Sequence, residues 1–418
     1  MLKALRKRTA RVVQGYYELG FIRGGSYPDF VYDERVKDLG SQIPVFVFHA
    51  VSSKDLEEKL QHLATNGYRT VIADALADCI ENKTKASPKT VVLTFDDGDE
   101  SLWSIAYPLL KKYGFVGVAF IVPRWLRDAP EHESSKEEEF NQRFVSWQQA
   151  SAMHQSGVID FQSHSLSHNM IFTSNTIKDF VNPSLLGSSY DRIPVPADGE
   201  DSAGSNVLPL GMPIYTVAPR FAGGRRYCDD VGMRNACIAY AKEKGGASFF
   251  EKPFWRKELA GEATRYESTN GLKDGYESDE ERDQAILHEL VGSKEIIEKR
   301  LHKSVRHLCH PFYCGSQLVI SLSSKCGYRS SYWGWPVPSS RYSARYGHDH
   351  LHTSCHLTDL STGSSLNGKR TNRPGDDPFK IVRLPSDYIF RLPGEGRKSL
   401  AQIMIRKSLR NLRGSEKR

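Results

Sequence analysis

The sequence predicts a single α/β domain in which parallel strands and helices alternate and close into an elaborated barrel. Three observations lead to this prediction. Short apolar runs, each about the length of a buried strand, alternate with helical stripes of apolar residues. The connections between them are short, as in βαβ units. A chain of 418 residues also has room for one barrel of about 200–250 residues that carries insertions.

Local patterns predict the elements in chain order. A helix over 52–67 begins at a serine cap and ends at a glycine, and the stripe over 102–113 becomes a regular helix only from Pro108, because proline fits the first helical turn. Ser278 and Glu281 form a capping box that opens a long helix. Strands are predicted at 43–49, 71–73, 91–95, 116–122, 158–161 and 305–309, and residues 382–387 are expected to close the sheet.

Charge is distributed unevenly along the chain, whose net charge is +7. Residues 1–11 carry five basic and no acidic side chains, and residues 397–418 carry eight basic and one acidic, so the remainder is mildly acidic. We therefore expect a basic N-terminal segment (1–42), a barrel (43–396) and a basic amphipathic tail (397–418). No basic face with aromatic or helical readout elements is evident, so nucleic acid is not an expected partner.

The tail leaves two interpretations open. Its apolar residues recur near helical spacing among arginines and lysines. Such a helix can lie on an anionic membrane surface, where each nearby Lys or Arg adds about 1 kcal/mol. It can equally pack on the barrel with a solvated basic face.

The expected location is the cytoplasm, with peripheral contact at the inner membrane face if the basic ends bind there. No run approaches the roughly 20 apolar residues of a membrane-spanning helix. The first residues are basic but lack the apolar core of a secretory signal. Seven cysteines, an odd number without paired spacing, fit a reducing compartment.

Two polar motifs carry the predicted chemistry. The string TFDDG (94–98) ends one apolar run, and SHSLSH (163–168) follows another. One carboxylate and two histidines four residues apart provide three metal ligands and leave a position open for water, while the second carboxylate can act as base. Taken alone, the acidic pair could be a polar turn and the histidine pair a solvated helix face. Because both follow strands, where α/β proteins display functional residues, the catalytic interpretation is favoured.

With these motifs, the chain resembles the polysaccharide deacetylase superfamily, metal-dependent carbohydrate esterases that remove acetyl groups from glycans. The resemblance extends from about residue 43 to residue 332. It implies a distorted (β/α) barrel of about seven parallel strands, with a long insertion at roughly 169–280 between the second and third motifs. It also implies that Asp96 is the catalytic base. The implied ligands of one divalent ion, expected to be Zn²⁺, are Asp97, His164 and His168.

The third motif of the family has an irregular counterpart in CHPFYCG (309–315). Neither the usual arginine nor the usual tyrosine stands in its place. The resemblance implies that the backbone amide of Phe312 donates to the oxyanion. Arg383 or Asp387, near the end of the chain, are the candidates to replace the missing partner of the base.

His49 ends the first predicted strand, IPVFVFH (43–49), ahead of the TFDDG motif. This order is similar to that of the poly-β-1,6-N-acetylglucosamine deacetylase branch, in which the strand order is permuted and the general-acid histidine lies on the first strand. The resemblance therefore implies that His49 is the general acid. The alternative is a histidine that only satisfies its hydrogen bonds at a strand end.

Other features keep two interpretations each. The aromatic stretches 221–227 and 249–255 of the insertion could stack on sugar faces or pack locally. The histidine-rich loop 348–356 could bind a second metal or only bind metal adventitiously. Cys309 and Cys314 could be small core residues or have a redox or metal role.

The function expected from the sequence is metal-dependent removal of the N-acetyl group from an amino-sugar glycan or glycan precursor. The expected partners are an acetylated oligosaccharide or a sugar precursor. Two alternatives remain: hydrolysis of a small non-carbohydrate amide, and a catalytically impaired glycan-binding pseudoenzyme, which the irregular third motif suggests.

Overall fold

The computed structural model describes residues 19–20, 22, 27–84, 87–128, 143–185, 193–196, 208–334 and 371–413. The chain divides into two compact units. The first contains the described residues of Met1–Ser167, Leu287–Ser339 and His356–Arg418, and the second contains those of His168–Ile286. The predicted insertion, 169–280, falls within the second unit. The basic residues 1–11 and the histidine-rich loop 348–356 lie outside the described residues.

The first unit is built on one sheet of parallel strands. They are β1 (Val45–Phe48), β2 (Arg69–Thr70), β3 (Thr90–Asp97), β4 (Gly117–Ile121), β5 (Ile159–Ser163), β10 (His307–Cys309), β11 (Ser330–Tyr332) and β12 (Leu384–Pro385). Their order is β11-β10-β5-β4-β3-β1-β12, and the short β2 pairs beside the start of β3. Tyr332 also forms a parallel bridge with Ile381, three residues before β12, so the sheet closes. The predicted distorted α/β barrel of about seven parallel strands is confirmed.

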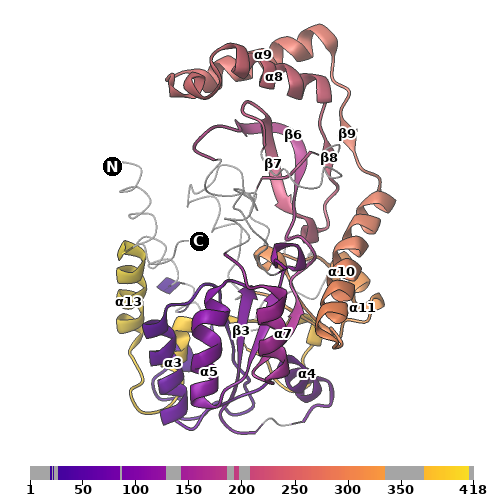
Figure 1. The fold of residues 1–418 in the computed structure, drawn as a ribbon. Coiled ribbons are helices and arrows are strands. Elements are labelled where there is room, and N and C mark those ends of the chain that lie inside the picture. The colour runs from indigo at the N-terminus through magenta and orange to yellow at the C-terminus, as the bar shows by residue number, and fades with distance from the viewer. Residues whose placement is uncertain are drawn as a thin grey trace. The chain divides into compact units, whose positions relative to one another are not determined.

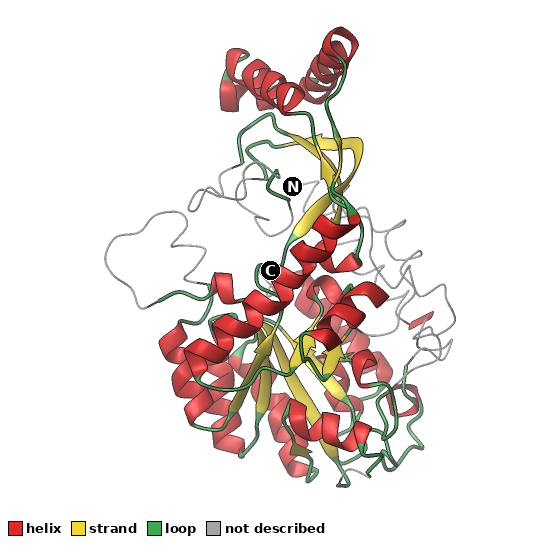
Figure 2. Cartoon of the chain, turned by 90° about the vertical axis from the view of Figure 1, so that its right-hand side faces the viewer, coloured by secondary structure: helices red, strands yellow, loops and turns green. Residues whose placement is uncertain are grey.

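Helices surround the strands of this unit (Figure 2). They are α2 (Asp29–Tyr32), α3 (Ser53–Thr65), α4 (Ala73–Glu81), α5 (Tyr107–Tyr113), α7 (Trp147–Gln155), α10 (Asp279–Leu301), which begins in the second unit, α11 (Gln317–Lys325) and α13 (Leu400–Arg413). A π-helical segment, η1 (Leu102–Ala106), precedes α5, which begins at Tyr107 with Pro108 in its first turn, so the regular helix begins one residue before the predicted start. The capping box is also confirmed: the Ser278 N–H donates to Glu281 at 2.6 Å, and the Glu281 N–H donates to the Ser278 hydroxyl at 3.1 Å.

The prediction of a strand at 71–73 is wrong. The strand is the pair Arg69–Thr70, and α4 already begins at Ala73. Leu76 and Ile80 on this helix are fully buried at helical spacing. Burial of that apolar stripe therefore outweighs the β-propensity of the preceding valine and isoleucine.

Close-packed apolar side chains hold the strands together. One cluster joins β1, β3, β4 and β11 and includes Val45, Val92, Val118, Phe120, Tyr332 and Ile381, each fully buried. Burying one such aliphatic side chain contributes about 1.5–3 kcal/mol. The polar residues at the carboxyl ends of the strands are therefore displayed from a rigid backbone.

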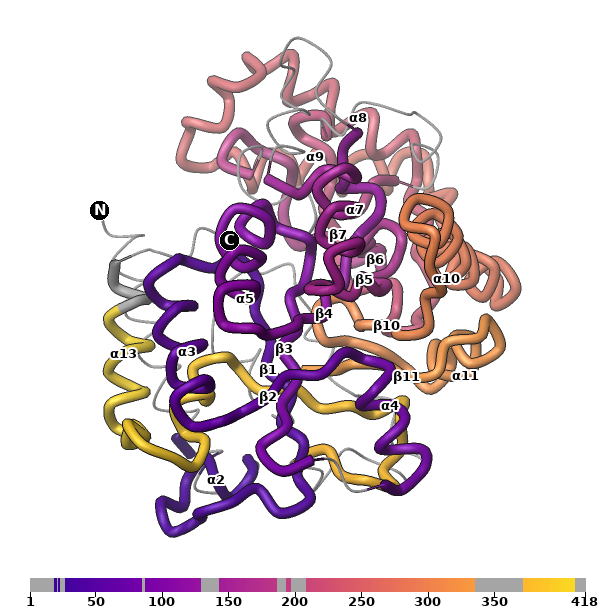
Figure 3. Tube along the Cα trace, turned by 60° about the horizontal axis from the view of Figure 1, so that its bottom comes forward, coloured from indigo at the N-terminus to yellow at the C-terminus, as the bar shows by residue number. Residues whose placement is uncertain are grey.

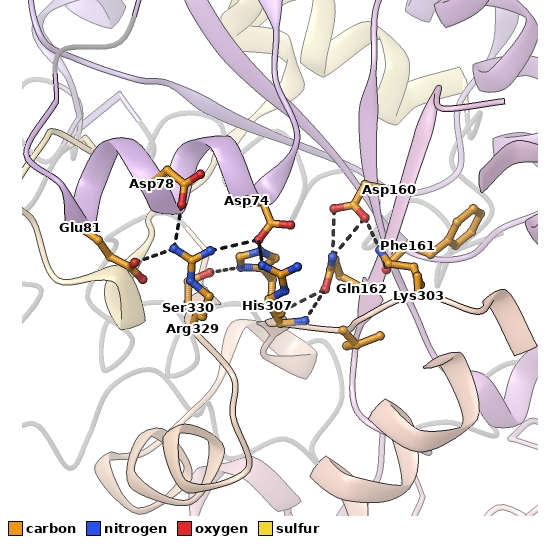
Figure 4. Close-up of polar contacts among 12 residues, drawn as sticks. Asp74, Asp78, Glu81, Asp160, Phe161, Gln162, Lys303, His307, Arg329 and Ser330 are labelled. Atoms are coloured by element: carbon orange, nitrogen blue, oxygen red, sulfur yellow. Dashed lines mark hydrogen bonds and ion pairs between the residues drawn. The ribbon is translucent and has the colours of Figure 1, made fainter. Parts of the chain in front are cut away.

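A polar network ties α4 to the amino ends of β10 and β11 (Figure 4). His307, fully buried, contacts the Ser330 hydroxyl through Nδ1 at 2.8 Å and the Asp74 carboxylate through Nε2 at 3.1 Å. Arg329, next to Ser330, donates to Asp78 at 2.8 Å and to Glu81 at 2.6 Å. We call these six residues the Asp74 network, and it connects three elements that are far apart in the sequence.

Gln162 strengthens the junction of β5 and β10, where the ladder has a single paired position, Leu308 with Ser163. Its side-chain carbonyl accepts the N–H groups of Arg306 at 3.0 Å and His307 at 3.1 Å (Figure 4). The side chain thus supplies hydrogen bonds that a longer ladder would provide.

The described residues of the second unit include two antiparallel strand pairs and, besides the start of α10, two α-helices (Figure 1). The pairs are β6 (Met170–Phe180) with β7 (Pro213–Pro219) and β8 (Tyr227–Cys228) with β9 (Gly275–Tyr276), and the helices are α8 (Val231–Glu243) and α9 (Trp255–Asn270). Phe221, Phe249 and Trp255 are buried, whereas Phe254 is 70% exposed. Most of the aromatic side chains in these two stretches therefore pack locally, which is the second of the two interpretations of the insertion.

The C-terminal helix α13 lies beside α3 (Figures 1 and 3). Ile403 is fully buried, and Arg406 pairs with Asp55 at 2.7 Å and Glu58 at 2.6 Å. Of the two interpretations of the tail, packing on the barrel is the one observed, although Arg406 is paired with acidic residues rather than solvated. Among the described residues, no helix combines the length and the apolar character needed to cross a membrane.

Candidate active site

The residues predicted to be functional gather at the carboxyl ends of the barrel strands. Asp96 and Asp97 end β3, His49 follows β1 directly and His164 follows β5 directly. Cys309, the first residue of the third motif, ends β10. This is the face where (β/α) barrels carry their active sites.

Asp97, His164 and His168 form the first candidate metal site. One ligand atom from each lies within 4.8 Å of the others, and His164 Nε2 is 3.5 Å from Asp97 Oδ1. His168 stands at the point where the chain enters the second unit, only four residues after His164. Two nitrogen or oxygen ligands of a tetrahedral zinc ion, each about 2.0–2.1 Å from the metal, lie about 3.3–3.4 Å apart. The donor set and its spacing therefore fit a divalent ion.

The orientation of His164 is held by neighbouring elements. Its Nδ1 contacts the Cys309 carbonyl oxygen at 2.9 Å, which directs Nε2 toward Asp97. Helix α10 supports the segment that follows His164, since Glu289 accepts the Ser167 N–H at 2.9 Å. Gly292 of the same helix allows Leu166 to pack closely, because a Cβ there would lie 2.9 Å from its side chain. The imidazole is thus positioned before any ion binds.

Backbone strain is concentrated in the predicted motifs. Eight non-glycine residues of the described chain have positive φ, and five of them belong to the three motifs. Each left-handed residue costs roughly 1–2 kcal/mol, and such residues cluster at functional sites. The five are Asp97 (φ 72°), Ser165 (66°), His168 (56°), Phe312 (54°) and Tyr313 (58°).

Asp96 is buried and bound by Arg383, which lies just before β12. The guanidinium donates through Nη1 to Oδ1 at 2.7 Å and through Nη2 to Oδ2 at 2.8 Å. Burial would raise the pKa of the Asp96 carboxyl, but the charge of Arg383 outweighs it and holds that pKa below its ordinary value. Asp387, the other candidate, instead lies 3.9 Å from Lys59 Nζ. Arg383 is therefore the partner of the candidate base.

His49, directly after β1, lies close to the Asp96 carboxylate. Its Nε2 lies 3.9 Å from Asp96 Oδ2 and 3.4 Å from the Tyr313 hydroxyl, and its side chain is 35% exposed. A histidine in this place borders both the candidate base and the solvent. Tyr313 was not among the predicted site residues, although a tyrosine within the third motif was a signal that could have pointed to it.

The third motif forms a tight turn, η6 (Pro311–Tyr313), directly after β10. Phe312 occupies its strained centre, and its role as an oxyanion donor stays a prediction. His310 is buried, and burial, with the charges of His164 and Arg383, lowers its pKa to about 3. A Cβ at Gly315 would lie 2.7 Å from His310 Nδ1, so the glycine makes room for this neutral imidazole.

Comparisons with known proteins agree with these motifs. A profile of the polysaccharide deacetylase family matches residues 83–182, which contain the first two motifs. YxkH of Bacillus subtilis (strain 168) is 29% identical over 136 residues, covering 31% of this chain and 44% of that protein. Poly-beta-1,6-N-acetyl-D-glucosamine N-deacetylase of Escherichia coli (strain K12) is 28% identical over 145 residues, which cover 34% of this chain and 21% of that protein.

The chain thus spans less than half the length of the curated relatives it matches. A solved structure of a de-N-acetylase from Aggregatibacter actinomycetemcomitans aligns with a TM-score of 0.46 at 17% identity, covering 82% of this chain and 95% of that one.

Proposed function

We propose that the chain is a metal-dependent carbohydrate N-deacetylase of the polysaccharide deacetylase superfamily, whose profile matches residues 83–182. Its substrate would be an amino-sugar glycan or glycan precursor that carries an N-acetyl group. One observation supports this most directly: three metal-ligand side chains converge beside a buried carboxylate held by an arginine. The position of His49 ahead of the first motif also supports the proposal, because it is similar to the arrangement of the poly-β-1,6-N-acetylglucosamine deacetylase branch.

In this proposal Asp97, His164 and His168 hold one divalent ion, expected to be zinc. Such an ion would polarise the acetyl carbonyl and lower the pKa of water in its open position. Asp96 takes the proton of the attacking water, and Arg383 keeps the carboxylate ionised and oriented for that task. His49 then donates a proton to the departing amine. The Phe312 amide is the proposed donor to the oxyanion.

The location is also part of the proposal. We keep the cytoplasm as the expected compartment, with a sugar nucleotide or a lipid-linked oligosaccharide as substrate. The exposed apolar residues Ile405 and Leu409 on α13 leave peripheral membrane contact open as a prediction.

Substitution of the ligands and of the base tests the proposal. Asp97→Asn and His164→Ala should lose bound metal and turnover together, because each removes a ligand. Asp96→Asn should retain metal while turnover falls by about 10²–10⁴-fold. Metal content by mass spectrometry and acetate release from an N-acetylglucosamine oligomer measure the two effects. Asp128→Asn, at a side chain 69% exposed, is the matched control and should change neither.

The outcomes separate the alternatives. Unchanged acetate release by Asp96→Asn would remove the proposed base. Metal binding without turnover on any acetylated glycan would support the pseudoenzyme. Turnover restricted to small amides would support the non-carbohydrate hydrolase.

A further inference from the structure

A second set of possible metal ligands lies deeper in the same barrel. One ligand atom each from Asp96, His164 and Cys309 lies within 4.8 Å of the others, and all three residues are buried. Cys309 Sγ is 3.7 Å from Asp96 Oδ2. The thiol of Cys309 therefore faces the candidate base rather than only filling core volume.

The spacing of this set suits a metal ion. A tetrahedral zinc ion holds sulfur at about 2.3 Å and carboxylate oxygen at about 2.0–2.2 Å, which places the two ligand atoms about 3.5–3.7 Å apart. The observed separation of Sγ and Oδ2, 3.7 Å, lies within this range. Little movement is needed for the two side chains to share an ion.

His164 belongs to both ligand sets. Its Nδ1 contacts the Cys309 carbonyl oxygen at 2.9 Å, which leaves Nε2 as the nitrogen that either set would use. One nitrogen serves one ion at a time. The two sets are therefore alternative positions for a single ion, not a two-metal centre.

We propose that the barrel offers an ion two positions, an outer one at Asp97, His164 and His168 and an inner one at Asp96, His164 and Cys309. Thiophilic ions such as Cd²⁺ take the inner position. Binding there forms a metal–sulfur bond, and the thiol proton of Cys309 leaves to solvent. It also turns Asp96 into a ligand, so the inner position is inhibitory; that last step rests on the proposed function.

Charge and ligand softness decide between the positions. Arg383 contacts both oxygens of Asp96, so its positive charge opposes any cation at the inner position. A hard ion such as Mg²⁺ gains little from sulfur and is kept out. A soft ion gains enough from the thiolate to overcome the repulsion. The inner position is therefore selective for thiophilic ions.

Cadmium binding to the metal-free full chain tests this proposal without any activity measurement. Titration with Cd²⁺ should produce the ultraviolet sulfur-to-cadmium charge-transfer band in the wild type. Cys309→Ser should abolish the band and weaken cadmium binding by at least about tenfold. Cys314→Ser, a change at another buried thiol of the same turn, is the matched control and should keep the band. Asp97→Asn should also keep it, because this change removes only an outer ligand.

X-ray absorption at the cadmium edge of the wild type provides a measurement that needs no variant to fold. A sulfur neighbour supports the inner position, whereas a shell of nitrogen and oxygen alone overturns it. A band that survives Cys309→Ser overturns it as well. Neither result depends on acetate release, so failure of this inference is distinguishable from failure of the proposed deacetylase.

Discussion

At the scale of single residues, the pairing of Asp96 with Arg383 sets the state of the candidate base. Both side chains are almost fully buried, and the arginine satisfies both carboxylate oxygens. Breaking a buried pair by removing one partner typically costs about 3–5 kcal/mol, because the other charge is left uncompensated. The pair therefore matters for folding as well as for the proposed proton transfer.

Arg383→Lys should lower both stability and turnover. Lysine keeps the charge but cannot form the bidentate contact, so the orientation of Asp96 is lost. We expect the free energy of unfolding to fall by about 1–3 kcal/mol and acetate release to fall by at least about tenfold. Urea denaturation and an acetate assay measure the two effects.

Arg300→Lys is the control for this prediction. Arg300 pairs with Asp128 on the surface, where both side chains are substantially exposed. Weakening this ion pair should therefore change the free energy of unfolding by less than about 1 kcal/mol. Equal effects of the two substitutions would show that the buried pair has no special role.

At the scale of elements, the Asp74 network joins α4 to β10 and β11 at the amino ends of the strands (Figure 4). The hydrogen bond from His307 lowers the pKa of the Asp74 carboxyl from 3.8 to about 2, against the opposing effect of burial. A carboxyl whose pKa is lower in the folded state stabilises the protein above its unfolded pKa. That contribution is lost as the pH falls through the folded value.

Asp74→Asn should therefore destabilise the barrel in a pH-dependent way. Near pH 6 we expect a loss of about 1 kcal/mol in the free energy of unfolding, since the carboxylate is partly solvated. The difference from the wild type should shrink as the pH falls from about 4 to about 2. Urea denaturation across this range measures it, and a difference that stays constant with pH would contradict the role given to the carboxylate charge.

At the scale of the whole molecule, α13 returns the end of the chain to the barrel near its start. The helix lies beside α3 (Figure 3). Its buried side packs through Ile403, and Arg406 joins it to acidic residues of α3. The opposite side exposes Ile405, which is 60% accessible. This amphipathic helix thus packs on the barrel with one side and exposes an apolar residue to solvent on the other.

Substitutions of Ile403 and Ile405 test this difference between the buried and the exposed side of α13. Ile403→Ala should lower the free energy of unfolding by about 2–4 kcal/mol, because it leaves a cavity under the helix. Ile405→Ala should change it by less than about 0.5 kcal/mol. Urea denaturation of both variants measures the contrast, and similar losses would mean that α13 is not packed as described.

The sequence determined the parts of this protein that depend on local pattern. Hydrophobic periodicity predicted the strands β1, β3, β4, β5 and β10 and the helices α3, α5 and α10, since burial of one face imposes a repeat that short windows reveal. The two polar motifs placed Asp96, Asp97 and His164 at strand ends. The error at 71–73 arose where a short apolar run fitted both a strand and the start of a helix.

Only the tertiary structure decided which distant side chains meet. Asp96 and Arg383 are 287 residues apart in the chain, and Cys309 and Asp96 are 213 apart. Sequence alone left Arg383 and Asp387 as equal candidates and could not tell a core thiol from a possible metal ligand. Closure of the sheet brings β3, β10 and the segment before β12 to one end of the barrel, and contacts of this kind have no local signature because they arise from the ring of strands as a whole.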